Sequence, residues 1–206
     1  MRCVLALFEG VVTGAADGYW RMGERPAATL LHFGPGLGNG LANLHNAKKA
    51  NSGIVNIVGE HASYHIKYDA PLTADIEGIA QPVSHWVKTS TEAIIVAADD
   101  AAAIAMASTP PGHIATLILP GDMAWNEGSG PVKVPAIPMR PKVADDTIKR
   151  QRRFWRKAQG RCFCLLARGC ESGGWHWPVP SPTRPARAFW RRVPTHACNE
   201  ALGGCQ

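Results

Sequence analysis

The stretch TLLHFGPGLGNGLANLHNA, residues 29–47, decides the fold. It opens inside an apolar run from Ala27 to Phe33, which is the pattern of a buried strand. Gly34-Pro35-Gly36 then predicts a turn, because glycine and proline interrupt regular elements. From Leu37 to Lys49 the pattern predicts a helix, and its two final lysines suit the negative end of the helix dipole. A strand followed at once by a helix is the repeating unit of an α/β protein.

Further strand and helix units lie on both sides of this stretch. Short apolar runs predict more strands, and apolar residues at helical spacing predict more helices. The strands are expected at 2–8, 54–58, 82–87 and 114–119, and the helices at 9–21, 73–80 and 91–106. The segment 60–72 contains Pro71 and predicts a long loop. Strands that alternate with helices predict a parallel sheet with helices on both faces, an α/β fold.

The charge of the chain divides it near residue 148. Residues 1–148 carry 10 Lys and Arg against 14 Asp and Glu, a net charge of −4, whereas residues 149–206 carry 12 against 2, a net charge of +10. Five of the six cysteines also lie after 148. We therefore expect a folded domain over 1–127, a linker rich in Gly and Pro over 128–148, and an irregular basic tail over 149–206.

Composition excludes several classes of protein. The apolar start of the chain is too short for the core of a secretory signal, and no apolar run has the length of a membrane span. The folded part contains Cys3 alone, so a disulfide framework is not expected there. We expect a cytoplasmic protein without a membrane partner.

In parallel sheets ligands bind outside the carboxyl ends of the strands. Function is therefore sought at Phe8-Glu9, at Gly34-Pro35-Gly36 and at Gly59-Glu60-His61. One hypothesis is a nucleotide-binding module in which Glu60 holds a ribose hydroxyl. The glycine spacing fails for it, because the third glycine of the G-x-G-x-x-G pattern would fall on Asn39 or Leu41.

The second hypothesis rests on three blocks in order: LFEGVVTGAADGYWRM at 7–22, TLLHFGPGLGNGLANLHNA at 29–47 and IVNIVGEHA at 54–62. Together they resemble the N-terminal, pyrimidine-binding domain of thiamine-diphosphate enzymes, specifically the acetolactate synthase large-subunit family. The family pattern has an acidic residue that opens a helix, and later a Gly-Pro-Gly segment with Asn shortly after it. Glu9, Gly34, Pro35, Gly36 and Asn39 fall on this pattern.

The resemblance implies a role for each of these residues. Glu9 would bind the aminopyrimidine ring and favour its imino form, which deprotonates the thiazolium carbon so that a carbanion attacks a 2-keto acid. Gly34, Pro35, Gly36 and Asn39 would line the ring, and Glu60 would also contact the cofactor, at a position where the synthases usually carry Gln. The simpler interpretation of Glu9 is an acidic residue that suits the dipole of its helix.

The resemblance also implies what lies outside this domain. Thiamine diphosphate needs Mg²⁺, and in the family a separate C-terminal domain with a Gly-Asp-Gly motif holds both the metal and the diphosphate; here Gly121-Asp122 is followed by Met123. The family's first strand–helix unit is expected to be missing before Met1. A homodimer or homotetramer is expected, and a fragment without activity on its own. No metal site is expected at His61 and His65, which are assigned structural or substrate-facing roles.

Two interpretations remain open for 149–206. The first is translation in a shifted reading frame: a one-base shift permits ATGARLL from 183–190 and RMQRGAGRVP from 196–206, strings similar to the central domain of the same family. The second is a basic arm, KRQRRFWRK at 149–157, which could bind nucleic acid. The shifted frame is preferred, so a nucleic-acid partner is not expected.

Overall fold

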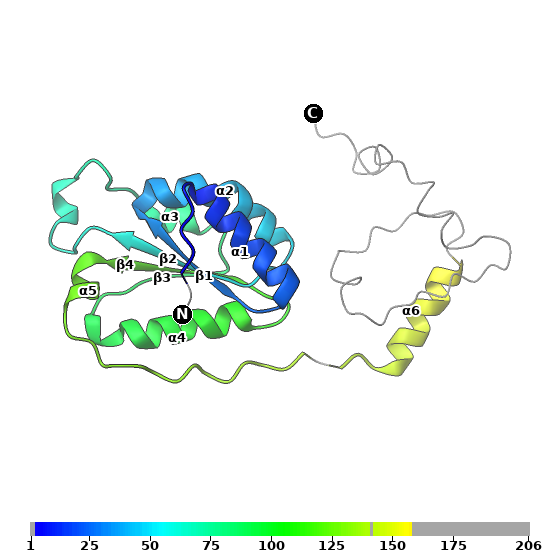
Figure 1. Ribbon diagram of the computed structural model, residues 1–206. Helices are drawn as coiled ribbons and strands as arrows, with labels where there is room; N and C mark the ends of the chain where they lie inside the picture. Colours follow the sequence, from blue (N-terminus) through cyan, green and yellow to red (C-terminus); the bar gives the residue numbers. More distant parts are fainter. Residues whose placement is uncertain (1–2, 141, 158–206) are drawn as a thin grey trace, which may run out of the picture. The chain divides into compact units, whose positions relative to one another are not determined.

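The computed structural model describes residues 3–140 and 142–157, with the side chains of 154–157 left out. Within these residues a sheet of four parallel strands has the order β1-β2-β4-β3 (Figure 1). Its strands are β1 (Ala27–His32), β2 (Ile54–Glu60), β3 (Trp86–Thr89) and β4 (Ile114–Pro120). The pairing is in register along the whole of β2, from Ile54 opposite Ile114 to Glu60 opposite Pro120. The expected parallel α/β fold is confirmed.

Three helices cover one face of the sheet. They are α1 (Glu9–Gly23), α2 (Phe33–Lys49) and the short α3 (Ile76–Ala80), which Figure 1 shows on the same side. The larger core lies beneath them, where side chains of α2 meet β1, β2 and β4; its buried members include Leu31, Leu37, Leu44, Ile54, Val58, Ile114 and Ile118. Burying this apolar surface is the main force that holds the helices to the sheet.

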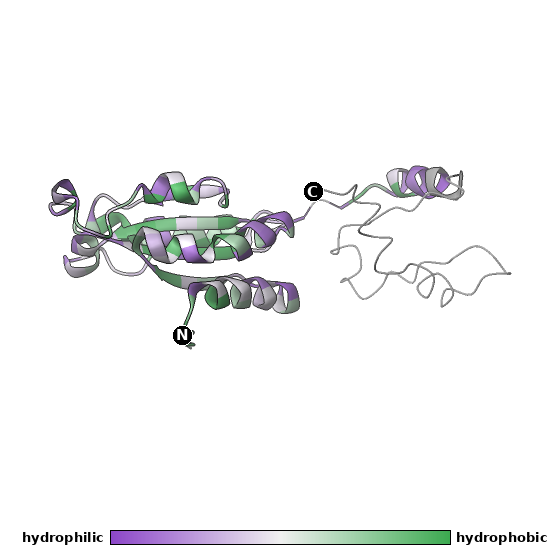
Figure 2. Ribbon diagram, turned by 90° about the horizontal axis from the view of Figure 1, so that it is seen from above, coloured by the Kyte–Doolittle hydropathy of each residue, from purple (hydrophilic) through white to green (hydrophobic). Residues whose placement is uncertain are grey.

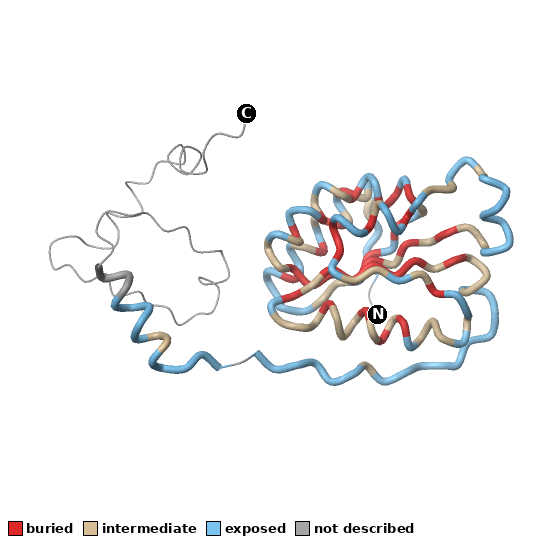
Figure 3. Tube along the Cα trace, turned by 180° about the vertical axis from the view of Figure 1, so that it is seen from behind, coloured by how far each residue is buried: buried red, intermediate tan, exposed pale blue. Residues whose placement is uncertain are grey.

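The opposite face is covered by α4 (Val96–Ser108), which follows the short 3-10 helix η2 (Ala93–Ile95). Its alanines pack on β2 and β4, where Val55, Ala103, Ala107 and Ala115 form a second, smaller core. Small side chains let the helix lie close to the strands. Figure 2 shows hydrophobic colouring concentrated along the strands, and Figure 3 shows that buried residues lie in the strands and on the helix faces that meet them.

The predicted strand at 2–8 is wrong for the part that the structure describes. Residues 3–8 have no regular structure, and Val4, Leu5 and Leu7 are exposed. An apolar run becomes a strand only when a neighbouring strand takes up its backbone hydrogen bonds, and β1 pairs with β2. The pattern of apolar residues in a segment cannot show whether a neighbouring strand is available to pair with it.

Three other boundaries differ from expectation. Gly34-Pro35-Gly36 does not form a separate turn but lies in the first turn of α2, because Phe33 reverses the chain in a single residue with φ of 57°. Proline is tolerated there because the first helical N–H groups have no intrahelical partner. The strand expected at 82–87 is β3, which begins only at Trp86, and the helix expected from residue 73 begins at Ile76, after Asp75 caps it.

After β4 the chain forms α5 (Gly121–Trp125) and then a segment without helix or strand in the described residues of 126–144. The chain is then helical over α6 (Asp145–Lys157), so the expectation of irregular structure from residue 149 is wrong for its first nine residues. The remaining tail lies outside the described residues, and its two interpretations stay predictions. The helices of the described part are too short or too polar to span a membrane.

A row of polar side chains crosses the sheet beneath α2. Thr29 Oγ1 donates to Asn56 Oδ1 at 2.7 Å, Asn56 Nδ2 donates to Thr116 Oγ1 at 3.1 Å, and Ser84 Oγ lies 2.7 Å from the same Thr116 oxygen. All four residues are buried. Because a buried polar group is costly when its partner is lost, this row favours one register of β1, β2 and β4.

We predict that Asn56→Ala lowers the free energy of unfolding by about 2–3 kcal/mol, because it removes two buried hydrogen bonds and leaves a cavity. Urea unfolding followed by circular dichroism measures the change. The control is Asn46→Ala on the exposed side of α2, for which we expect a change within about 0.5 kcal/mol. If the two variants lower the free energy of unfolding equally, the polar row does not stabilise the sheet.

Candidate functional site

Glu9 is brought to the carboxyl edge of the sheet by α1, of which it is the first residue. Its Oε2 accepts a hydrogen bond from Asn39 Nδ2 at 3.1 Å, across 30 residues of sequence. Gly36 lies against the other oxygen: a Cβ built on Gly36 would be 3.6 Å from Glu9 Oε1 and 3.7 Å from the Cβ of His32. Three of the six predicted site residues therefore meet at one point.

The other three predicted residues take different positions. Gly34 is buried, and a Cβ there would lie 2.5 Å from the Cβ of Ala74, so Gly34 lets the segment before α3 pack on α2. Pro35 is exposed beside it. Glu60 is buried at the end of β2, where its Oε1 accepts a hydrogen bond from the backbone N–H of His61 at 2.7 Å. Their part in a cofactor site stays a prediction.

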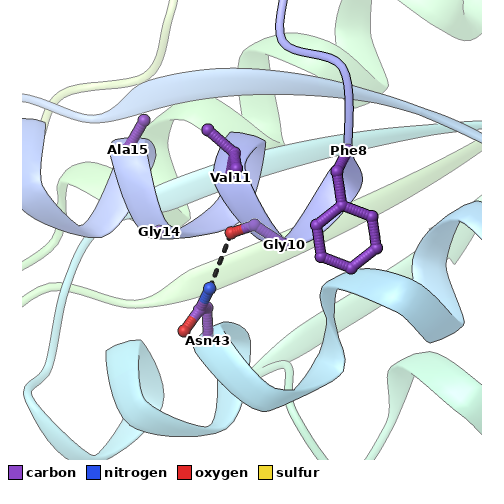
Figure 4. Close-up of a pocket in the computed structure, with 6 residues that line it drawn as sticks. All are labelled: Phe8, Gly10, Val11, Gly14, Ala15 and Asn43. Carbon is purple, nitrogen blue, oxygen red and sulfur yellow. Dashed lines mark hydrogen bonds between the residues drawn. The ribbon is translucent and has the colours of Figure 1, made fainter.

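The position of Glu9 depends on the contact between α1 and α2. Thr13 Oγ1 donates to the carbonyl oxygen of Gly40 at 3.1 Å, and Asn43 Nδ2 donates to that of Gly10 at 2.6 Å (Figure 4). A Cβ on Gly40 would lie only 2.8 Å from Thr13 Cγ2. The two helices can approach this closely because glycine stands at the crossing.

The start of α2 and the segment after β2 are joined by a chain of aromatic rings. The sequence pointed to His61 and His65 but did not predict this chain. The ring of His32 contacts that of Phe33, with centroids 4.1 Å apart, and Phe33 contacts His61 at 4.5 Å. His65 follows His61 at 5.4 Å, and Tyr68 of the 3-10 helix η1 (Ile66–Tyr68) follows His65 at 5.6 Å. Phe33 has a positive φ of 57°, which is uncommon for a bulky residue and which the sequence does not reveal.

The same segment is tied to α5. Asp122 accepts hydrogen bonds from the backbone N–H of Ser63, at 2.9 Å, and from Ser63 Oγ. These bonds from Ser63, the side-chain bond foremost, lower the pKa of the Asp122 carboxyl. Among the described residues, no cluster of three His, Cys, Asp or Glu is placed to hold a metal ion.

Comparison with known proteins identifies the domain. Residues 1–85 match the family model described as "Thiamine pyrophosphate enzyme, N-terminal TPP binding domain". Over these residues the chain is similar to the N-terminal domain of thiamine pyrophosphate enzymes. Thiamine pyrophosphate is another name for thiamine diphosphate, so the resemblance inferred from the three sequence blocks is confirmed.

Two curated proteins are similar to part of this chain. The "Putative acetolactate synthase large subunit IlvX" of Mycobacterium tuberculosis is 60% identical over 129 residues, 63% of this chain and 25% of that protein. The benzoylformate decarboxylase of Pseudomonas aeruginosa is 34% identical over 122 residues, 59% of this chain and 23% of that protein. The chain thus spans about a quarter of the length of these relatives.

A solved structure shares the fold as well. The X-ray structure of a "putative thiamin diphosphate-dependent enzyme" from Mycobacterium smegmatis superposes with a TM-score of 0.64 at 28% identity, and covers 74% of this chain and 29% of that one. The parallel sheet and its helices therefore match the fold of part of a thiamine diphosphate-dependent enzyme.

We predict opposite effects for two glycines on α2. Gly40→Ala should lower the free energy of unfolding by about 1–3 kcal/mol, because the new methyl group would press against Thr13. Gly38→Ala, whose methyl group would point into open space, should raise it by about 0.5–1 kcal/mol, since alanine favours helix. Chemical unfolding of both variants measures the difference. Stabilisation by both would show that α1 and α2 are not in close contact at Gly40.

We also predict that Ser63→Ala raises the pKa of Asp122 toward its ordinary value, because the hydroxyl that donates to the carboxylate is lost. Since the folded-state pKa of Asp122 is lowered, its bond to Ser63 stabilises the segment at neutral pH, and this contribution is lost as the pH falls through that pKa. A carboxyl carbon NMR titration measures it. Tyr64→Ala, next along the exposed loop, is the control; an Asp122 pKa that moves in both variants or in neither would contradict the assignment.

Proposed function

We propose that this domain binds the aminopyrimidine ring of thiamine diphosphate, that Glu9 activates the ring, and that the whole protein acts on 2-keto acids. The observation that carries the proposal is the position of the Glu9 carboxylate between Asn39 and Gly36. Glu9 is also the first residue of α1, where a carboxylate suits the helix dipole. That interaction does not require a hydrogen-bond partner on α2. The contact with Asn39 therefore supports a role beyond capping.

The two oxygens of Glu9 have different surroundings. Asn39 Nδ2 donates to Oε2 and so holds the orientation of the carboxyl group. Oε1 lies on the side of Gly36, where a Cβ would stand 3.6 Å from it. A carboxyl group whose one oxygen is fixed can share a proton at the other with a ring nitrogen, which is the task of a general acid and base.

Thiamine diphosphate, when bound, would supply the carbanion chemistry needed for a reaction at a keto carbon. The residues of this chain would bind and orient the ring, and Glu9 would hold or release the proton at Oε1. The relatives support 2-keto acid chemistry, because one of them is a decarboxylase of benzoylformate, which is a 2-keto acid, and the other is named as an acetolactate synthase subunit. A carbon–carbon lyase or transferase is the corresponding reaction class.

Other parts of the proposal rest on the family resemblance. Mg²⁺ and the diphosphate would be held by a separate domain, so this chain alone would supply part of a site and no turnover. A homodimer or homotetramer and a cytoplasmic location complete the proposal. The nucleotide-binding alternative is less well supported, because the Glu60 carboxylate that would hold a ribose is buried and already bound to the His61 N–H.

Calorimetric titration of the full chain with thiamine, thiamine diphosphate and NAD tests the proposal. We expect thiamine and thiamine diphosphate to bind with similar affinity, because the pyrimidine is common to both. Glu9→Gln should weaken both by about tenfold, the effect of losing one charged hydrogen bond. Glu24→Gln at the opposite end of α1 is the matched control and should bind as the wild type does.

Two results would overturn the proposal. Binding of NAD without binding of thiamine would favour the nucleotide module. Thiamine binding that Glu9→Gln leaves unchanged would place the ring elsewhere on the domain.

A further inference from the structure

The edge strand β3 is joined to β4 through a histidine side chain at the amino end of the sheet. The backbone N–H of His85 donates to the carbonyl oxygen of Ile114 at 2.8 Å, and the backbone N–H of Ile114 donates to His85 Nδ1 at 3.0 Å. The paired residues of the two strands begin directly after this contact, with Trp86 opposite Ala115. The contact between His85 and Ile114 therefore closes this end of the edge strand.

The bond from Ile114 defines the protonation state of His85. A ring nitrogen that accepts a hydrogen bond carries no proton, so the partner assigns His85 as neutral with its proton on Nε2. A protonated imidazole has a donor on both nitrogens and no acceptor. It would set two N–H groups against each other and leave the N–H of the fully buried Ile114 without a partner. The contact therefore requires the neutral ring.

A second histidine touches the first and has the opposite tautomer. The rings of His85 and His113 meet edge to face, with centroids 4.8 Å apart. Nδ1 of His113 lies 3.0 Å from the carbonyl oxygen of Thr109, and because a carbonyl only accepts, this nitrogen carries the proton. A further proton on His113 would bind Nε2 and keep the bond to Thr109. Protonation therefore costs a hydrogen bond at His85 and not at His113.

The charged groups that face His85 are cationic. Lys48, in the last turn of α2, donates to the carbonyl oxygens of Pro82 at 2.8 Å and Ser84 at 3.0 Å, in the turn that leads to His85. Burial, followed by the positive charges of His113 and Lys48, lowers the pKa of His85 below its ordinary value. These surroundings favour the neutral ring that the bond from Ile114 requires.

The carboxylates of the neighbouring helices are bound elsewhere. In α3, Asp75 accepts a hydrogen bond from within the helix and Glu77 accepts one from Thr89. In α4, no charged residue follows Asp100, which lies in the first half of that helix. In the described structure neither helix therefore gives His85 a carboxylate partner that would stabilise its charged form.

We propose that His85 acts as a pH-sensitive switch, which joins β3 to β4 when its ring is neutral and releases the first residues of β3 when the ring is protonated. His85 is an exposed residue, so a proton reaches the ring without unfolding of the domain. The turn before it stays bound to α2 through Lys48, which confines the opening to the contact with Ile114. The switch lies at the edge of the sheet opposite Glu9 and does not depend on the proposed function.

The direction of the pH dependence follows from the lowered pKa. Because the pKa of His85 is lower in the folded chain than in the unfolded chain, the contact contributes its full stability above about pH 6.5, the ordinary pKa of histidine. This contribution is lost as the pH falls through the lowered pKa of His85.

The experiment is amide hydrogen exchange of the full chain from about pH 8 to about pH 5, followed by NMR and corrected for the intrinsic exchange rate at each pH. We expect the protection of the Ile114 N–H to fall at least about tenfold toward pH 5, the effect of losing one hydrogen bond. The N–H of Ile54 donates to the backbone oxygen of His113 at 3.0 Å and is the internal control, which should keep its protection.

Two matched variants separate the histidines. His85→Asn places an amide oxygen where Nδ1 accepts the bond, and an amide does not titrate in this range, so the protection of the Ile114 N–H should become independent of pH. His113→Asn keeps a donor for Thr109 but removes a positive charge beside His85. In that variant the protection should still fall, at a higher pH than in the wild type. Circular dichroism checks that both variants keep the fold.

Three results would overturn the proposal. One is protection of the Ile114 N–H that does not change with pH in the wild type, and another is the same loss of protection in His85→Asn. The third needs no variant: long-range ¹H–¹⁵N correlations of the wild type near neutral pH should place the proton of His85 on Nε2 and that of His113 on Nδ1. A proton on Nδ1 of His85 would contradict the hydrogen bond on which the switch depends.

Discussion

The close contact between α1 and α2 is the constraint on which the candidate site depends. Gly40 allows α2 to approach Thr13, and the bonds from Thr13 and Asn43 to backbone oxygens fix the two helices at that distance. Glu9 begins one helix and Asn39 lies a residue before the crossing on the other. Their hydrogen bond is therefore a consequence of helix packing, and it places a carboxylate where neither helix alone would hold it.

The second constraint is the turn at Phe33. Because one residue with positive φ joins β1 to α2, the glycines at 34 and 36 lie inside the first turn of a helix and not in a loop above the sheet. Gly34 then faces Ala74 and Gly36 faces Glu9. Two glycines that are two residues apart thus serve different purposes, one in packing and one at the site. The family resemblance alone assigned both to the cofactor.

The sequence predicted the strands and helices in the middle of the chain better than the structure of residues 2–8 and of the region after 149. The strands at 27–33, 54–58 and 114–119 and the helices between them are confirmed, because buried strands and amphipathic helices have distinct periods. Residues 2–8 had the composition of a strand but no partner among the described strands. The irregular tail expected from 149 begins instead with α6, where charge composition was a poor guide to backbone structure.

The candidate site was predicted in part for a similar reason. Glu9, Gly36 and Asn39 were found from a sequence pattern, and the structure brings them together. His32 and Phe33 were missed, and His61 was not linked to them, because the contact between Phe33 and His61 joins segments that are far apart in sequence. A pattern records which residues occur together, whereas a long-range contact is visible only in the folded chain.

The most direct measurement of the central claim is an intermolecular NOE experiment on the full chain with thiamine. The account predicts contacts from the methyl and ring protons of the pyrimidine to Gly36 and Asn39. Contacts at the opposite edge of the sheet, near Gly112 and His113, would contradict it, as would pyrimidine contacts that do not include Gly36 or Asn39.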